Sequence, residues 1–207
     1  TFHHIGNRLL RMYGERINIK SDFTILDSDD SLSLIKSCVN SSGAPSDKYF
    51  PKARVIHSII SLSSNLCKGV KETIADRYDY LKPEYIPFIE QIAVAYRGRK
   101  IAINALDFDD LLIKWKELLE TDHELRARLG DKFKYILVDE YQDTNYLQSK
   151  IISLLAAPQN NVLVVGDDSQ SIYGFRGADV NNILNFPEVF AQFAESKEKD
   201  KVKIFRL

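Results

Sequence analysis

Two short apolar stretches, each running directly into an acidic turn, constrain the fold of this chain most. Residues 134–138 lead into Asp139 and Glu140, and residues 162–165 lead into the polar turn 166–170. Apolar runs rich in β-branched side chains are typical of buried strands in a parallel sheet. A helical pattern separates the two stretches, so a right-handed crossover should make them parallel neighbours. Both acidic turns then lie at one sheet edge, where α/β proteins bind their ligands.

The acidic residues after the first strand suit nucleotide hydrolysis. Adjacent residues of an extended chain point in different directions, so Asp139 and Glu140 can do different jobs. Asp139 would hold Mg²⁺, because this ion uses few carboxylates and takes its other ligands from water and phosphate. Glu140 would orient or deprotonate the water that attacks the γ-phosphate of ATP, and Gln170 would contact that phosphate. The plainer alternative is a solvated acidic turn.

Aromatic side chains follow the second acidic turn. Tyr173 and Phe175 stand at alternate positions, and Arg176 comes next. Rings at this spacing can stack on the bases of single-stranded DNA, an interaction worth about 1–3 kcal/mol per base that is indifferent to base sequence. A structural role in the core is the competing interpretation.

Residues from about 27 to 106 show no strand alternation and favour an all-helical subdomain. Predicted helices follow the capping residue Asp27, run from Pro51 to a C-cap at Lys68–Gly69, and span 84–102. A basic helix is predicted at 1–20, and Arg97, Arg99 and Lys100 form a second basic patch. For the first of these patches, a solvated helix face competes with a nucleic-acid contact.

The remaining elements are predicted from caps and periodicity. Acidic residues at 107–110 cap an amphipathic helix, and a second short helix ends at Gly130. After the second acidic turn we expect helices at 180–184 and 187–194 and a final apolar strand at 202–207. Both chain ends look cut, which suggests that this sequence is an internal piece of a longer protein.

Composition excludes few classes of protein. Lys and Arg number 28 against 29 Asp and Glu, so any binding to nucleic acid must rely on local patches. The sequence shows neither a signal peptide nor a run that could cross a membrane, which favours the cytoplasm. Cys38 and Cys67 form no metal-binding spacing and are interpreted as reduced structural thiols.

Four motifs in order resemble those of the UvrD/Rep/PcrA-type superfamily 1 DNA helicases. Residues 138–145, VDEYQDTN, are similar to motif II of that family, and residues 165–179 are similar to its motif III. The first three residues, TFH, resemble motif Ib. Residues 106–112, LDFDDLL, resemble the segment that leaves the family's helical insertion domain.

The resemblance implies a fold and a role for each matched residue. The fold is α/β, a RecA-like parallel sheet of the P-loop NTPase type with an inserted all-helical subdomain. Residues 1–23 and 107–207 would belong to the RecA-like 1A domain, and 24–106 to the helical 1B insertion.

The implied site residues match those inferred from the strand ends and add a path for DNA. Asp139 is the Mg²⁺ residue, Glu140 the catalytic base and Gln170 the contact to the γ-phosphate of ATP. The residues implied for single-stranded DNA are Thr1, His3, Tyr173 and Phe175, and Arg176 would couple the two sites. Phe175 stands where relatives can carry Trp.

The sequence also departs from the family pattern. These 207 residues contain no GxxxxGK[ST] phosphate loop and no second RecA-like domain. We therefore expect the parent protein, with further helicase domains in cis, to hydrolyse ATP, to translocate on single-stranded DNA and to unwind duplex DNA, and this chain alone to be inactive. The alternatives are a two-metal nuclease or polymerase site using the Gly166–Asp168 run, and a non-catalytic module that binds DNA or a protein partner.

Overall fold

The computed structural model describes residues 1–156, 161–170, 181–188 and 203–205. The chain divides into two compact units, Thr1–Lys114 and Trp115–Leu207. The boundary falls inside helix α6 (Phe108–Thr121). Within the described residues, no helix is long and apolar enough to cross a membrane.

The first unit begins with helix α1 (Phe2–Tyr13), which is shorter than the predicted basic helix. Thr1 is its N-cap, and the Thr1 Oγ1 accepts a hydrogen bond from the His4 N–H at 3.4 Å. The chain continues as the 3-10 helix η1 (Gly14–Ile17) and ends it at Asn18, whose left-handed φ of 61° stops helical propagation. Asn is among the residues that best tolerate this conformation.

One arginine of the predicted basic helix has a structural role. The Arg11 guanidinium donates hydrogen bonds to the backbone carbonyls of Ser21 at 2.8 Å and Phe23 at 3.2 Å. It also lies over the Phe23 ring, 4.3 Å from the ring centroid. Arg11 therefore anchors the chain that leaves η1. A cation over an aromatic face strengthens such an anchor, most of all where it is partly desolvated.

Helices dominate the middle of the first unit, as the sequence predicts. They are α2 (Ser28–Ser41), α3 (Ala53–Asn65), α4 (Val70–Arg77) and α5 (Ile86–Ala102), and a short 3-10 helix η2 (Pro83–Tyr85) precedes α5. Asp27 caps α2 as predicted, because its carboxylate accepts from the N–H groups of Asp29 and Asp30. Helix α4 is missing from the predicted elements, although Val70, Thr73 and Ile74 are all buried on one face of it.

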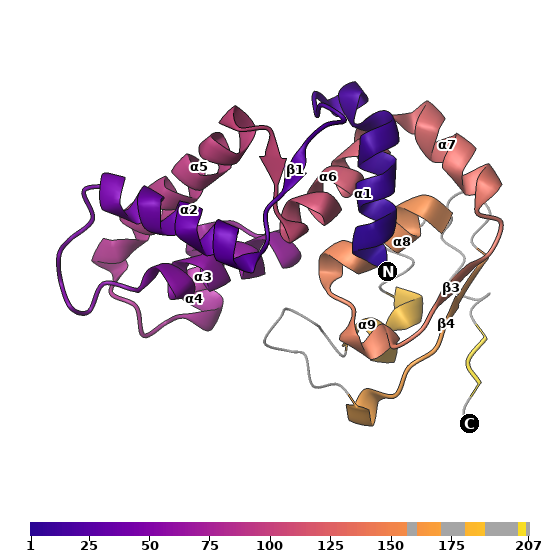
Figure 1. Cartoon of the computed structure of the whole chain (residues 1–207). Coiled ribbons are helices and arrows are strands. Elements are labelled where there is room, and N and C mark those ends of the chain that lie inside the picture. Colours follow the sequence, from indigo (N-terminus) through magenta and orange to yellow (C-terminus); the bar gives the residue numbers. More distant parts are fainter. Residues whose placement is uncertain (157–160, 171–180, 189–202, 206–207) are drawn as a thin grey trace. The chain divides into compact units, whose positions relative to one another are not determined.

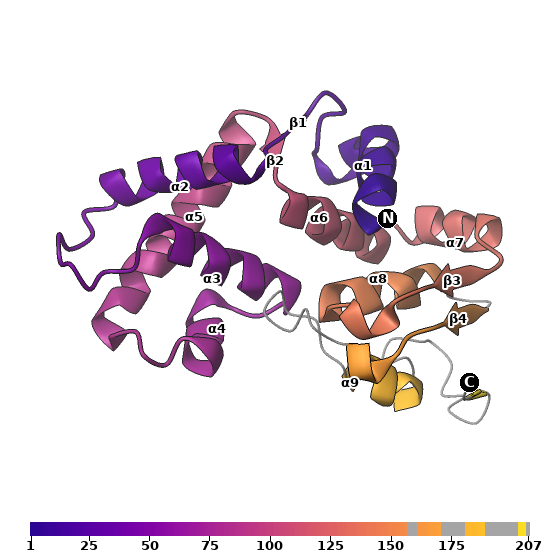
Figure 2. The same ribbon diagram turned by 60° about the horizontal axis from the view of Figure 1, so that its bottom comes forward.

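These four helices enclose a core of their own. Its most buried members come from every one of them and include Ile35, Cys38, Ile56, Ile59, Ile74, Ile89, Ile92 and Tyr96. Figures 1 and 2 show α2, α3, α4 and α5 gathered together in both views. The buried Cys38 thiol confirms the structural interpretation of that residue, whereas Cys67 is exposed and has a left-handed φ of 53°.

A short pair of parallel strands joins the two ends of this helical segment. Strand β1 (Thr24–Ile25) pairs with β2 (Ala105–Leu106), with Thr24 opposite Ala105. The sequence predicts an extended piece at β1 but no strand at β2, because two residues are too few to show a period. The pair brings the entry and exit of the helical segment side by side.

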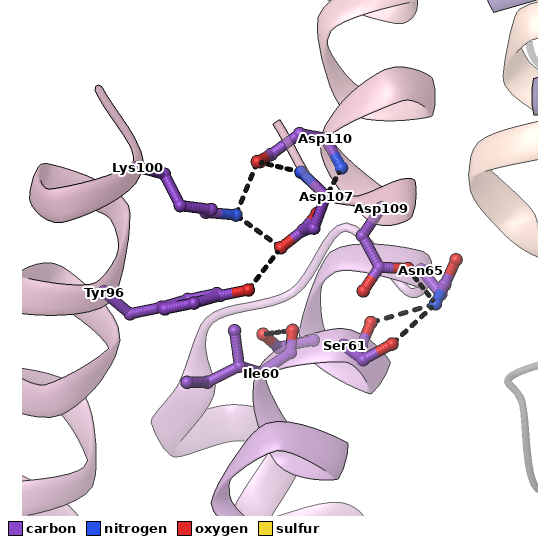
Figure 3. A network of polar contacts seen from close by, with 9 residues as sticks. Ile60, Ser61, Asn65, Tyr96, Lys100, Asp107, Asp109 and Asp110 are labelled. Atoms are coloured by element: carbon purple, nitrogen blue, oxygen red, sulfur yellow. Dashed lines mark hydrogen bonds and ion pairs between the residues drawn. The ribbon is translucent and has the colours of Figure 1, made fainter. Parts of the chain in front are cut away.

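A buried polar network lies where α5, α3 and the start of α6 meet (Figure 3). Lys100, predicted as part of the second basic patch, is only 5% exposed. Its Nζ lies 2.5 Å from the Oδ2 atoms of both Asp107 and Asp110. The Tyr96 hydroxyl donates to the same Asp107 oxygen at 2.8 Å. Lys100 therefore adds no surface charge to the predicted basic patch, because its charge is neutralised inside the unit.

The predicted acidic cap of α6 is confirmed. Asp107 Oδ1 accepts from the Asp110 N–H at 2.8 Å, and Asp110 Oδ2 accepts from the Asp107 N–H at 3.1 Å. Between them, the Asp109 carboxylate accepts from the Asn65 amide at 3.2 Å. Burial, and next the negative charge of Asp107, raise the pKa of Asp109 to about 6.

The second unit contains the two strands with acidic ends. Its elements are α7 (His123–Lys132), β3 (Ile136–Val138), the 3-10 helix η3 (Tyr141–Asp143), α8 (Tyr146–Ala156), β4 (Val162–Val164), the 3-10 helix η4 (Asp168–Gln170) and α9 (Asn181–Leu184). Strands β3 and β4 are parallel, with Ile136 opposite Val162 and Val138 opposite Val164. Figures 1 and 2 both show them side by side. The predicted parallel pairing is thus confirmed, and both acidic turns leave the same edge.

Three predicted details of this unit differ from the structure. The strands are not buried on both faces, because Leu137 is 74% exposed and Leu163 is 53% exposed. Helix α7 continues past Gly130 to Lys132. A final strand is predicted at 202–207, but the described part of it, residues 203–205, is not in a strand. The predicted helix 187–194 lies mostly outside the described residues.

Candidate functional site

The acidic pair after β3 sits at the start of a tight turn. Glu140 has a left-handed backbone, with φ 51° and ψ 42°, so the chain turns at this residue and does not continue as the predicted extended strand. The Glu140 N–H donates to Asp139 Oδ1 at 2.9 Å, which fixes one oxygen of that carboxylate. Both side chains are exposed, so they are accessible to a ligand. Residues other than glycine that adopt the left-handed conformation cluster at functional sites.

The turn after β4 is organised by Asp167. One of its carboxylate oxygens accepts from the Ser169 N–H at 2.9 Å, and the other accepts from Gln170 Nε2 at 2.9 Å. These bonds, with that from Gln170 first, hold the pKa of Asp167 below its usual range. The Gln170 amide is therefore tied to a charged side chain of its own turn.

Backbone and side-chain hydrogen bonds join the two turns. The Val165 N–H donates to the Val138 carbonyl at 2.8 Å, and the Tyr141 N–H donates to the Val165 carbonyl at 2.9 Å. The Gln142 side chain donates from Nε2 to Glu140 Oε2 at 2.7 Å, and its Oε1 accepts from the Asp167 N–H at 3.1 Å. Glu140, Gln142, Asp167 and Gln170 thus form one continuous network.

Gln142 is a residue that sequence reasoning missed. It is only 1% exposed, although it lies in the most polar stretch of the chain. Its position two residues after Glu140 was the available signal, because a polar residue in a functional turn is a candidate for holding the side chains around it. Its second partner, Asp167, is remote in sequence and could not be read from spacing.

The predicted DNA-binding residues are divided between described and undescribed parts of the chain. Thr1 and His3 lie at the start of α1, in the first unit. The His3 ring stands edge-on to Phe108, with centroids 5.8 Å apart, and Phe108 is 47% exposed. Partial burial is the main cause that lowers the pKa of His3. Tyr173, Phe175 and Arg176 lie outside the described residues.

Sequence comparison extends these observations to almost the whole chain. A family model described as the UvrD/REP helicase N-terminal domain matches residues 1–191. The chain belongs to the UvrD/REP helicase family.

Curated UvrD/REP helicases support this membership. The ATP-dependent DNA helicase PcrA of Leuconostoc citreum is 38% identical over 189 residues, which is 90% of this chain and 24% of that protein. The proteins of the same name from Staphylococcus epidermidis and Staphylococcus aureus are 39% identical over 195 residues, 93% of this chain and 26% of theirs. The chain therefore spans about a quarter of the length of these relatives.

The donor atoms of this UvrD/REP site fit a hard divalent cation. Asp139, Glu140 and Asp167 offer carboxylate oxygens, the ligand type that Mg²⁺ prefers. In the part of the chain that the structure describes, no three His, Cys, Asp or Glu side chains cluster closely enough to hold a metal by themselves. An ion here would complete its shell with water and phosphate, as Mg²⁺ usually does.

The geometry gives less support to a two-metal nuclease or polymerase site. Such a site needs carboxylates that converge on two ions about 3.5–4 Å apart. Gly166, Asp167 and Asp168 follow a strand that is parallel to its neighbour, so they do not form the hairpin turn expected of a polymerase palm.

Proposed function

We propose that this chain forms the metal- and water-handling part of the ATP site in an ATP-dependent DNA helicase that moves along single-stranded DNA and unwinds duplex DNA. The observation that carries the proposal is the hydrogen-bonded network at the ends of the parallel strands β3 and β4. Two family motifs contribute to it, and functional residues of open α/β sheets gather at this edge. The curated relatives are named ATP-dependent DNA helicases, which agrees with this function.

Each residue of the network has a distinct task in this proposal. Asp139 holds Mg²⁺, which when bound neutralises charge on the β- and γ-phosphates. The exposed Glu140 carboxylate orients the attacking water and takes a proton from it. Gln170 contacts the γ-phosphate through the amide that now bonds Asp167. Positioning of this kind supplies much of the catalysis in phosphoryl transfer.

The proposed domain layout follows the motifs. Residues 1–23 and 107–207 form part of a RecA-like 1A domain, and residues 24–106 form the helical 1B insertion. Two features of the first unit support an insertion: its helices α2 to α5 share a core drawn from residues 35–96, and the β1–β2 pair joins the start and end of that segment.

The proposed DNA path uses aromatic and polar side chains. Thr1 and His3 belong to it, and the exposed ring of Phe108 beside His3 offers a face on which a base can stack. Tyr173 and Phe175 supply further stacking rings, and Arg176 couples the DNA path to the ATP site. Stacking on aromatic rings is independent of base sequence, which suits a protein that moves along DNA.

Hydrolysis requires parts that these 207 residues do not contain. The sequence has no GxxxxGK[ST] loop, whose backbone and lysine cradle the phosphates of the nucleotide. We therefore expect DNA-stimulated ATP hydrolysis from the full-length protein with its further helicase domains, and none from residues 1–207 alone. ATPase activity of the purified 207-residue chain would contradict the second expectation.

A Glu140→Gln substitution in the full-length protein tests the central assignment. Glutamine keeps the size of the side chain but cannot take a proton, so DNA-stimulated kcat should fall by about 10²–10⁴-fold. Binding of a fluorescent ATP analogue should stay close to that of the unchanged protein. Glu188→Gln, at a position outside the network, is the matched control and should hydrolyse ATP normally. Normal turnover by Glu140→Gln would remove the assignment.

A further inference from the structure

Gln142 connects the two acidic turns through one buried amide. Its side chain is 1% exposed, and buried polar groups persist in proteins when they are hydrogen-bonded. The amide donates to Glu140 Oε2 at 2.7 Å and accepts from the Asp167 N–H at 3.1 Å. Glu140 is exposed, whereas the group that holds it is inside the unit.

The backbone conformation of Glu140 explains why its side chain needs a fixed hydrogen-bond partner. Its left-handed φ of 51° is a conformation that residues other than glycine adopt with strain. A long side chain on a strained turn samples several rotamers unless a fixed group bonds its end. Gln142 is fixed, because it lies in η3, next to the buried Tyr141, and its other amide atom is held by the β4 turn.

Gly166, the residue before Asp167, leaves room for the Gln142 amide. A Cβ added to Gly166 would overlap Gln142 Oε1 and would come within 2.7 Å of Ile183 Cδ1. The space next to the β4 turn is therefore filled by the Gln142 amide and not by a side chain at position 166. Both turns contribute to the way in which Gln142 is held.

We propose that Gln142 is a positioning residue that holds the Glu140 carboxylate in its working orientation, with the Asp167 turn as the anchor. Only a primary amide of this length offers a donor to a carboxylate and an acceptor to a backbone N–H at the same time. Glutamate at this position could accept but, when ionised, could not donate. The inference rests on the proposed function, because it assigns Gln142 an effect only through Glu140.

The first test is a Gln142→Ala substitution in the full-length protein, read as DNA-stimulated ATP hydrolysis. We expect kcat to fall by about tenfold, the effect typical of residues that orient a ligand or catalytic group, with KM for ATP unchanged within about twofold. Gln148→Ala is the matched control, because that side chain also accepts from a backbone N–H, that of Asn145 at 3.0 Å, and does not touch Glu140. Both kinetic constants of Gln148→Ala should be normal.

A double-mutant cycle separates positioning from a general structural role. In a Glu140→Gln background the positioned carboxylate is gone, so Gln142→Ala should cause no further loss of kcat. An equal loss in both backgrounds would overturn the inference. A normal kcat for Gln142→Ala, measured beside an impaired Glu140→Gln, would also overturn the inference. That outcome would leave the proposed function intact. Normal turnover by Glu140→Gln would overturn both.

A Gln142→Glu substitution keeps the inference testable if alanine at this buried position prevents folding. At about pH 8.5 a glutamate at 142 is ionised and cannot donate to Glu140, so kcat should fall by about tenfold or more relative to the unchanged protein at the same pH. A normal kcat in a folded Gln142→Glu variant at this pH would contradict the positioning role.

Discussion

Two clusters of carboxylates in this chain have similar composition and opposite surroundings. In the first unit Asp107 and Asp110 pair with the buried Lys100 at the start of α6, and Asp109 between them accepts a hydrogen bond from Asn65. In the second unit Asp139 and Glu140 are exposed at the end of β3, and an amide holds one of them. The comparison shows that burial and the nature of the partner, not the number of acids, decide what a carboxylate cluster does.

The difference has an energetic basis. A charge removed from water costs several kcal/mol unless a counter-charge and hydrogen bonds replace the solvent. Lys100 supplies the counter-charge in the first cluster, so those acids are committed to the fold. The second cluster keeps its solvent, and its acids stay available to a metal ion and to water. Substitutions should therefore change stability in the first cluster and activity in the second.

The largest effect on stability is expected from Lys100→Met. It leaves Asp107 and Asp110 buried beside each other without a cation, and breaking a buried pair in this way costs about 3–5 kcal/mol. Urea unfolding followed by circular dichroism measures the loss. Lys68→Met is the control, because Lys68 also contacts two carboxylates but its side chain is 38% exposed. Its cost should stay at or below about 1 kcal/mol, and equal costs would break the comparison.

An intermediate effect, dependent on pH, is expected from Asp109→Asn. The folded pKa of about 6 is above the ordinary value of 3.8, so the folded state holds this proton more tightly than the unfolded state does. Ionised Asp109 therefore destabilises the fold increasingly as pH rises from about 4 to 6. The asparagine variant should be more stable by about 3 kcal/mol at pH 7.5 and indistinguishable below about pH 4. A difference in the free energy of unfolding that does not change with pH would show that folding does not raise the pKa of Asp109.

The smallest effect on stability is expected from Asp139→Asn, the same chemical change in the second cluster. An exposed side chain outside the core usually changes the free energy of unfolding by less than about 0.5 kcal/mol. Urea unfolding at pH 7.5 should show no difference, while ATP hydrolysis by the full-length protein should be lost with Mg²⁺ binding. A stability change as large as that of Asp109→Asn would remove the distinction between the clusters.

The sequence predicts elements whose signal is local and repeated. The strands before Asp139 and Gly166 were predicted from apolar runs, and their parallel pairing was predicted from the handedness of crossovers. The cap formed by Asp107 and Asp110 was predicted because a helix N-terminus favours acidic residues wherever it lies. Each of these follows from one stretch of chain and one general rule.

Features that depend on contacts between distant residues were not predicted. Lys100 was predicted as part of a basic patch because Arg97 and Arg99 are close to it in sequence, and its acidic partners follow only after a turn and strand β2. Gln142 was overlooked because its anchor, Asp167, is 25 residues away. The β1–β2 pair has two residues on each side, too few for periodicity to reveal. The assigned roles of Asp139, Glu140 and Gln170 stay predictions.

The two contrasting glycines of this chain, Gly166 and Gly43, have a consequence for mutational tolerance. Gly43 has a φ of 66° and open space around it, so substitutions there are limited by backbone conformation alone. At Gly166 a methyl group would meet Gln142 Oε1 and Ile183 Cδ1 and would lie 3.1 Å from the Tyr141 backbone nitrogen, so alanine requires the Gln142 amide to leave its position. A library selected for ATP turnover would therefore reject alanine at 166 more strictly than one selected for folding alone.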